Sequence, residues 1–581
     1  MAVISRAIPT LLRGISQSSD ALKQPDHADI QDNADSNPVL GLTKRSGFQY
    51  ITALSSSTLG NVHIQTINRD LNERYVAVFS NGNVRVFELD GTELTVNKPD
   101  GTAYLNTSTP RSVMKTVTIA DFTFVVNTSI TAAMDSTLSG GTGTKAIIFI
   151  NQATANTTYS VTIDGVTVTD NTSGDSTLST DTIAADLKTG LDSGLTGFTI
   201  VRNGPVLYVR KNDNSNFSID GSDTQGDTKM TIIKDSVQRF TDLPTVSPHG
   251  YVVEVKGDED TNFDNYYVKF VGNNTTTDGV LEEGQWEETV EAGIQFKFDY
   301  ATMPHVLVRQ ADGNFRFAKV DGDSYTLSGV TYTLPKWGER TVGDLVSAPN
   351  PSFIGNKINN VFFFRNRLGF LAGDNVILSR VSEFFNFFPE TVISVLDSEP
   401  IDVAASHTKV AILKSAVTMG ERLILFSEQT QFVLTSSADN LTPKTANVIV
   451  ATEFESSAAA QPVGSGSSIY FLTQKGSFAG IREYIIQGES QIRDAANVTI
   501  HVPRLIPTNV FKMAVSTNQD ILVVLGSDNP NKLYVYRWLY GGDGQKALSA
   551  WFTYSINTNR SILNVDFIGT DLFVVIEEAN K

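Results

Sequence analysis

Short runs of alternating or continuous apolar residues, separated by polar turns, predict β-strands along most of the chain. The clearest pair lies in residues 74–87, where YVAVFS and VRVFEL flank Asn81-Gly82, a strong two-residue hairpin signal. Further pairs recur at loosely regular intervals: 423–426 with 432–434, 469–472 with 478–481, and 521–525 with 533–537. This repetition predicts a mainly β fold with an irregular β-propeller-like platform and additional β structure. Because no clean repeat such as Trp-Asp is present, a β-sandwich is the alternative.

The most aromatic stretch of the chain is residues 350–389. Alternation in 361–367 predicts one strand with two faces, Phe362 and Phe364 on one, and Val361, Phe363, Arg365 and Arg367 on the other. Residues 372–375 supply turn chemistry, and 376–378 return as a second strand. A hairpin that is apolar on both faces cannot stand alone in water. We therefore expect it inside a larger sheet assembly.

Residues 136–234 are rich in Ser, Thr, Gly, Asn and Asp, and this shift in composition indicates an inserted small domain. Two hairpins, 159–169 and 198–210, flank a predicted helix. Ile183, Leu187 and Leu191 lie on one face of that helix, and Asp181 is its expected N-cap. The order of elements predicts a ββαββ unit, a small α+β domain at the periphery.

The 581 residues are too many for one core, so we expect several domains or sub-domains. The expected division is an N-terminal arm and first platform strands in 1–135, the insert in 136–234, a β-rich return in 235–349, and propeller-like sheets in 350–581. Within the arm, residues 1–48 are polar and loop-like. The tryptophan of the sequence PKWG, at 335–338, is expected to anchor a loop.

Charge narrows the classes of function. The net charge of −18 argues against a protein that holds nucleic acid by releasing counterions, although it leaves open a conduit for DNA. The plainer interpretation is that acidity keeps an abundant protein soluble. There is no cysteine, so disulfides and thiolate chemistry are excluded, and no apolar run is long enough to span a membrane.

The sequence offers no strong catalytic, cofactor or metal signature. The six histidines are scattered, and there is no nucleophile elbow, P-loop or Rossmann fingerprint. Acidic pairs in 257–260 and at Glu282-Glu283 favour solvated loops over glycoside hydrolysis. Residues 212–227 are expected to form solvated turns, because Phe217 stands where a calcium loop needs a ligand. We predict no catalytic, cofactor-binding or metal residues.

Ordered motifs along the chain carry a resemblance to a known family. VFFFRNRLGFLAGDNVILSR and FFNFFP are preceded by RGISQSSDALKQPDHADIQDN, GLTKRSG and MPHVLVRQADGNF, and followed by IDVAASHTKVAILK and HVPRLIP. The chain resembles the tail tubular protein B family, the nozzle proteins of short-tailed bacteriophages, over most of its length except 136–234. The residues that carry the signature are Phe362, Phe363, Phe364, Arg365, Asn366, Arg367, Leu368, Gly369, Phe370, Gly373, Ser379, Arg380, Phe385, Asn386 and Phe387.

The resemblance implies a structural virion protein rather than an enzyme. It implies a homohexameric ring in the phage tail, below the adaptor ring formed by tail tubular protein A, with tail fibres held at the joint. Viral double-stranded DNA would pass through the lumen without sequence recognition, and the tip would meet the host envelope. Family members usually continue with further β structure, so this chain is expected to end earlier than they do. The alternative function is a β-rich tail protein that binds or degrades polysaccharide.

Arg365 and Arg367 are two residues apart and are therefore expected to share one face of a strand. Such arginines commonly pair with a carboxylate across a sheet or subunit boundary. In a channel they would instead contact the phosphates of passing DNA. We therefore take both as interface or channel arginines.

Overall fold

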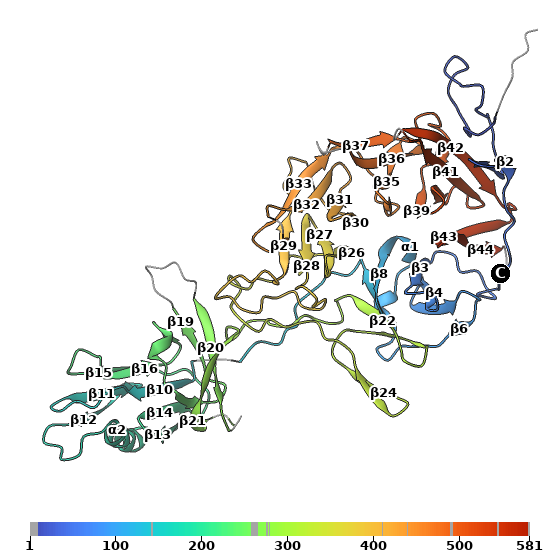
Figure 1. The fold of residues 1–581 in the computed structure, drawn as a ribbon. Coiled ribbons are helices and arrows are strands. Elements are labelled where there is room, and N and C mark those ends of the chain that lie inside the picture. Colours follow the sequence, from blue (N-terminus) through green and yellow to red (C-terminus); the bar gives the residue numbers. More distant parts are fainter. Residues whose placement is uncertain are drawn as a thin grey trace, which may run out of the picture.

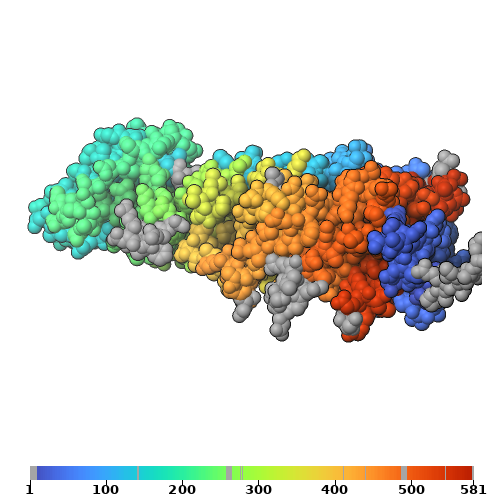
Figure 2. Space-filling model, turned by 90° about the horizontal axis from the view of Figure 1, so that it is seen from above, coloured from blue at the N-terminus to red at the C-terminus, as the bar shows by residue number. Residues whose placement is uncertain are grey.

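The computed structural model describes residues 10–140, 143–256, 265–274, 277, 279–409, 411–438, 440–487, 492–542 and 545–578. The chain forms a broad platform of sheets and a smaller lobe beside it (Figure 1). Seen from above, the lobe occupies one end of the elongated molecule and the N-terminal arm the other (Figure 2). Among the described residues, no helix has the length and apolar character needed to cross a membrane. The predicted mainly β fold class is confirmed.

Seven antiparallel or mixed sheets build the described part of the platform. Three come first: β3–β6 (His63–Asn68, Arg74–Ser80, Asn83–Glu88, Glu93–Leu94), β7-β23-β22-β9-β8 (Val96–Asn97, Phe315–Ala318, His305–Arg309, Phe122–Asn127, Met114–Ile119) and β26–β29 (Ile358–Phe364, Arg367–Ala372, Asn375–Leu378, Ile401–Ala404). Next come β30–β33 (Ser415–Met419, Arg422–Phe426, Gln431–Ser436, Ala446–Thr452) and β34–β37 (Val463–Ser465, Ser468–Lys475, Phe478–Gln487, Ile492–Asn497). The last are β39–β42 (Val510–Ser516, Ile521–Gly526, Lys532–Tyr540, Lys546–Ser555) and β43–β44 (Arg560–Ile568, Asp571–Glu578).

The seven sheets follow one another in a closed circle (Figure 1). One strand of each sheet contacts the corresponding strand of the next, in the order β3, β8, β26, β30, β34, β39, β43 and back to β3. An apolar cluster fills each of the seven boundaries between neighbouring sheets, so the platform has a distributed core rather than a single one. This circular order is what a propeller-like platform requires.

Smaller elements decorate the platform. They are the hairpin β1–β2 (Ala34–Asn37, Gly41–Lys44), the hairpin β24–β25 (Ser324–Leu327, Val330–Thr333), the strand β38 (Ile506–Pro507) and the helical turns η1 (Ala103–Leu105) and α1 (Pro110–Val113). The predicted Asn81-Gly82 hairpin is confirmed, since β4 and β5 pair directly on either side of it. The 335–338 loop is anchored as predicted, because the indole of Trp337 is buried and its Nε1 donates to the carbonyl of Pro304 at 3.3 Å.

Both predicted hairpins and the helix between them are confirmed, but the lobe contains three strands more than the ββαββ unit, and the prediction is wrong in that respect. Its elements are β10 (Lys145–Ile150), β11 (Thr158–Ile163), β12 (Val166–Asn171), α2 (Thr180–Gly194), β13 (Phe198–Asn203), β14 (Val206–Lys211), β15 (Ile219–Asp223) and β16 (Met230–Ile233). They form two sheets, β13-β14-β10-β16 and β12-β11-β15. The apolar face of α2 is buried as predicted, but its N-cap is Ser179, whose Oγ accepts the N–H of Thr182 at 3.0 Å. Asp181 lies in the first turn instead.

The lobe also extends beyond residue 234. A five-stranded sheet follows directly: β17 (Ser236–Val237), β18 (Val246–Pro248), β19 (Val252–Val255), β20 (Tyr266–Gly272) and β21 (Leu281–Thr289), with the short 3₁₀ turn η2 (Phe240–Asp242). Val253 and Phe270 of this sheet pack against Ile147 and Tyr208 of the first lobe sheet. These strands therefore share a core with residues 136–234 and pack on the lobe side of the molecule (Figure 1).

Candidate interaction surface

The signature stretch contains a turn that the sequence pattern did not predict. β26 ends at Phe364, and Arg365 and Asn366 both have positive φ angles, 46° and 58°. Positive φ at both central residues is the requirement of a type I′ hairpin turn. Phe364 then pairs directly with Arg367, the first residue of β27. The expected single strand 361–367 is therefore wrong, and Arg365 and Arg367 do not share a strand face.

The two arginines have different surroundings. Arg365 is partly exposed in the turn and lies 3.7 Å from the carboxylate of Glu421, an exposed ion pair. Arg367 is buried, and its guanidinium donates to the main-chain carbonyls of Ser379, Asp397 and Glu399 at 2.6, 3.0 and 2.6 Å. Burial lowers the pKa of Arg367 to about 10. A side chain enclosed in this way cannot contact passing DNA, so Arg367 is not a channel arginine.

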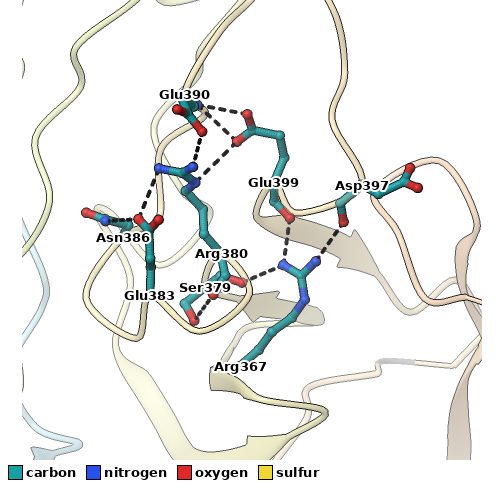
Figure 3. A network of polar contacts seen from close by, with 8 residues as sticks. All are labelled: Arg367, Ser379, Arg380, Glu383, Asn386, Glu390, Asp397 and Glu399. Atoms are coloured by element: carbon teal, nitrogen blue, oxygen red, sulfur yellow. Dashed lines mark hydrogen bonds and ion pairs between the residues drawn. The ribbon is translucent and has the colours of Figure 1, made fainter.

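A second arginine of the signature ties the same loop together (Figure 3). Arg380 forms ion pairs with Glu383 at 3.0 Å and with Glu390, and its Nε lies 3.9 Å from the carboxylate of Glu399. Glu399 is buried and accepts the main-chain N–H of Glu390 with both carboxylate oxygens, at 2.9 and 3.0 Å. Burial raises the pKa of Glu399. Arg367 and Arg380 together fix both ends of the 390–399 loop.

The aromatic residues of the signature fill the boundary next to this loop. Phe370 and Phe387 stack with their centroids 5.1 Å apart, and Phe385 meets Trp337 edge to face at 5.3 Å. Phe362 and Phe364 point into the neighbouring boundary with the β30–β33 sheet. Gly369 is required on β27, since a Cβ there would lie 2.3 Å from the ring of Phe362. Leu368 packs with the first group, and its N–H donates to Ser379 Oγ at 3.0 Å.

Sequence reasoning missed a second buried arginine in this region, Arg340. Its guanidinium donates to the carbonyl of Ala348 at 2.8 Å and to Asn350 Oδ1 at 2.6 Å, and it lies over the ring of Phe388. It thereby holds the 343–348 loop. That loop touches the 390–399 loop, because Gly343 is packed against Val392. The signal available in the sequence was only a charged residue between apolar segments, which does not distinguish a buried arginine from an exposed one.

The two loops display apolar side chains to solvent. The exposed residues are Leu345, Val346, Ile393, Val395 and Leu396, which we call the loop patch. The exposed carboxylate residues Glu383, Glu390 and Asp397 belong to the same region of the chain. Exposed apolar residues gathered on two adjoining loops are typical of an interaction surface rather than of a core.

A second exposed apolar group lies on the N-terminal segment. It consists of Val39, Leu40 and Leu42, which we call the arm patch, beside the exposed Lys44; the exposed Tyr50 and Ile51 follow along the chain, where Thr52 lies against Gly91. The segment that precedes the patch is anchored on β42, where Gly14 pairs with Trp551 and Asp32 with Thr553. The arm patch and the loop patch therefore lie on different parts of the platform, near β42 and near β28–β29 (Figure 1).

The acidic residues that the sequence offered as catalytic or calcium-binding candidates have structural positions or partners where the structure describes them. Glu282 and Glu283 are consecutive on β21 and point to opposite faces of the sheet, so they do not form a catalytic pair. The acidic stretch 257–260 lies outside the described residues. The expected solvated turns at 212–227 are partly wrong, because β15 runs through this stretch and Phe217 is buried. Asp223, at the end of β15, accepts main-chain N–H groups of Gln225 and Lys229.

A cluster of three aspartates and the buried His305 also have partners within the chain. Asp100, Asp321 and Asp323 lie close together, but Lys319 forms ion pairs with Asp100 at 3.4 Å and with Asp321 at 3.2 Å. The ring of His305 is buried against Tyr104, at a centroid distance of 4.0 Å, and burial lowers its pKa to about 4. Lys319 already supplies a cation to the acidic cluster, and His305 is a packed core histidine.

Comparison with known proteins agrees with the resemblance seen in the sequence. The chain is 34% identical to the tail tubular protein gp12 of Escherichia phage T7 over 599 residues, covering 99% of this chain and 71% of that protein. Among solved structures, Sqt1 of Chaetomium thermophilum has a TM-score of 0.29 at 8% identity, covering 90% of this chain and 91% of Sqt1. A putative 6-phosphogluconolactonase of Bacteroides uniformis has a TM-score of 0.26 at 15% identity, covering 59% and 93%.

Scores this low for the solved structures carry no argument about function. The match to a family model decides the question, since the model of the bacteriophage nozzle protein covers residues 1–581. Both the family match and the phage relative span essentially the whole chain. The protein is therefore a structural nozzle component of a phage short tail, located in the virion tail, and it belongs to the bacteriophage nozzle protein family.

Proposed function

We propose that six copies of this chain close into a ring through contact between the arm patch of one copy and the loop patch of the next. The observation that carries the proposal is the presence of two different exposed apolar surfaces on one chain. A head-to-tail ring needs two different surfaces on each subunit, whereas a two-fold dimer needs only one. The charges agree in sign, because Lys44 accompanies the arm patch, whereas Asp397 and the carboxylates of Glu383 and Glu390, which share Arg380, accompany the loop patch.

We extend the proposal to the wider assembly that the family resemblance implies. We propose that the ring joins an adaptor ring of tail tubular protein A, that tail fibres bind at the joint, and that viral double-stranded DNA passes through the lumen towards the host envelope. We also propose that the chain has no catalytic activity. The alternative of a polysaccharide-degrading protein finds little support, because the acidic residues that the structure describes on β21 and β15 are not arranged as a catalytic pair.

The ring is tested by negative-stain microscopy and sedimentation of the purified chain. The wild type is expected to form rings, and Val395→Asp or Leu40→Asp is expected to leave monomers. The matched control is Leu178→Asp, which places the same charge at an exposed leucine of the lobe. If all three variants formed rings, neither patch would lie in the interface between subunits. Release of reducing sugar from host polysaccharide by the wild type would instead favour the enzymatic alternative.

A further inference from the structure

One segment of the N-terminal arm, residues 14–28, closes on itself and packs on the platform. We call it the arm loop. Its two ends are joined, because Ser16 N–H donates to Ala28 O at 3.0 Å and Ala28 N–H donates to Gly14 O at 2.9 Å. The side chain of Ile15 is buried in the apolar cluster between the β34–β37 and β39–β42 sheets. The base of the arm loop is therefore fixed to the platform.

The rest of the arm loop contacts the turn between β37 and β38. Gln17 N–H donates to His501 O at 2.8 Å, and Gln17 Oε1 accepts the N–H of Arg504 at 2.7 Å. In the same contact, the imidazole ring of His27 lies beside that of His501, with the ring centroids 5.9 Å apart and the planes at 43°. A histidine of the arm thus meets a histidine of the platform across the interface.

Each of the two rings has a nitrogen that is shielded from solvent and unpaired. Among the described residues, neither His27 Nδ1 nor His501 Nε2 has a hydrogen-bond partner. A neutral imidazole tolerates this, because one of its nitrogens carries no proton, whereas an imidazolium has an N–H on both. A proton on either ring would therefore bury an N–H without an acceptor, and protons on both would place two positive charges side by side.

The charges around the pair do not offset this cost. Burial, the largest cause, lowers the pKa of His27; the carboxylate of Asp26 opposes this effect, and the charges of Arg13 and Lys23 add to it. Asp26 is already engaged in an ion pair with Arg13 at 2.7 Å. Burial and the neighbouring His27 lower the pKa of His501 to about 4. Both rings are therefore neutral at pH 7 while the arm loop is docked.

We propose that His27 and His501 form a pH-sensitive latch, which holds the arm loop on the platform at neutral pH and releases it in acid, when the rings gain protons. In the released loop both rings regain the ordinary histidine pKa of 6.5. Between about pH 4 and 6.5 the released form therefore binds protons that the docked form excludes. Docking is fully favoured above pH 6.5 and is lost as the pH falls towards 4.

Hydrogen exchange of the full chain at pH 7.5 and pH 5 tests the latch, read as protection factors so that the intrinsic effect of pH on exchange is removed. In the wild type, the protection of Gln17 and Ala28 should fall at pH 5 by on the order of tenfold or more, and return at pH 7.5. His27→Gln and His501→Gln should each lose a large part of this change, and the double variant most of it. The control is His305→Gln, which removes a buried histidine elsewhere in the platform and should keep the full change.

Asp26→Asn tests the latch with both rings in place. Because its carboxylate favours the protonated form of His27, its loss should move the midpoint of release to lower pH. An unchanged or higher midpoint would contradict the proposal, and so would an equal fall in protection in the wild type and the double histidine variant. Histidine variants that lower the protection at pH 7.5 but keep the full change at pH 5 would show that the two rings only pack.

Discussion

The guanidinium of Arg537 on β41 donates to both carboxylate oxygens of Asp35, 502 residues earlier in the chain, at 2.9 and 2.8 Å. Both side chains are largely buried, with 9% and 17% of their surface exposed. The pair joins the N-terminal hairpin to the β39–β42 sheet. Together with the bridges from Gly14 and Asp32 to β42, it anchors the segment that carries the arm patch.

Asp35→Asn is expected to loosen the arm. The amide cannot replace the carboxylate, and Arg537 is left largely buried with a weakened partner, at a cost of roughly 1–3 kcal/mol. Proteolysis within 17–31 should become faster, and urea unfolding should show the loss of stability. The control is Asp29→Asn on the same arm, because Asp29 is 89% exposed in its ion pair with Lys23. Equal effects of the two substitutions would mean that the buried pair does not anchor the arm.

Arg367→Lys is expected to release the 390–399 loop. A lysine cannot reach three carbonyls with the geometry of a guanidinium, so at least one buried carbonyl loses its partner, at about 2–4 kcal/mol in total. Hydrogen exchange of the main chain in 391–399 should accelerate, and ring formation should weaken with it. Arg365→Lys is the matched control, since Arg365 is partly exposed two residues away. A loop that exchanges at the wild-type rate in the Arg367 variant would contradict this account.

His305 is expected to make stability depend on pH. Its pKa is about 4 in the folded chain and 6.5 when unfolded, so between these values only the unfolded state binds the proton. The contribution is fully present above pH 6.5 and is lost as the pH falls towards 4, up to roughly 3 kcal/mol. His305→Gln should flatten this part of the curve, and at pH 7.5 it should cost about 1–3 kcal/mol through lost stacking.

The matched substitution for that measurement is His249→Gln, at a half-buried position in the lobe. Because this variant keeps His305, its unfolding free energy should keep the slope between pH 6.5 and 4 that His305 causes. If His305→Gln kept the full wild-type slope between pH 6.5 and 4, the buried imidazole would not be the source of the dependence. A hydrolytic turnover that vanished with His305→Gln would overturn its structural role altogether.

Local patterns predicted the hairpins well, and long-range packing is where they failed. Asn81-Gly82 specifies its turn by residue type, with a positive φ of 66° at Gly82, whereas Arg365-Asn366 has positive φ at both residues and begins with an arginine, which rarely signals a turn. The apolar pattern around Phe270 indicated β structure, but it did not indicate that this strand would pack against the first sheet of the lobe. The contact of Asp35 with Arg537 could not be predicted, since nothing in either local sequence names a partner 502 residues away.

The last prediction concerns the lobe, because the position of its boundary determines which deletion leaves a folded protein. Removal of 136–234 alone would uncover Val253, Val268 and Phe270, which pack against Ile147 and Tyr208. Removal of 141–292 takes the whole lobe and leaves two ends that already meet, since Gly293 N–H donates to Ser139 O at 3.1 Å. We therefore expect the larger deletion, with Gly140 joined to Gly293, to be soluble and cooperatively folded.

The smaller deletion, joined by a Gly/Ser linker, should aggregate because an apolar sheet face is left without its cover. Soluble yield, far-UV circular dichroism and thermal unfolding compare the two proteins. The larger deletion also removes Glu288, which accepts hydrogen bonds from Thr391 and Val392, so its 390–399 loop should exchange faster while the platform stays folded. A soluble, folded product from the smaller deletion, together with aggregation of the larger one, would show that β17–β21 belong to the platform and not to the lobe.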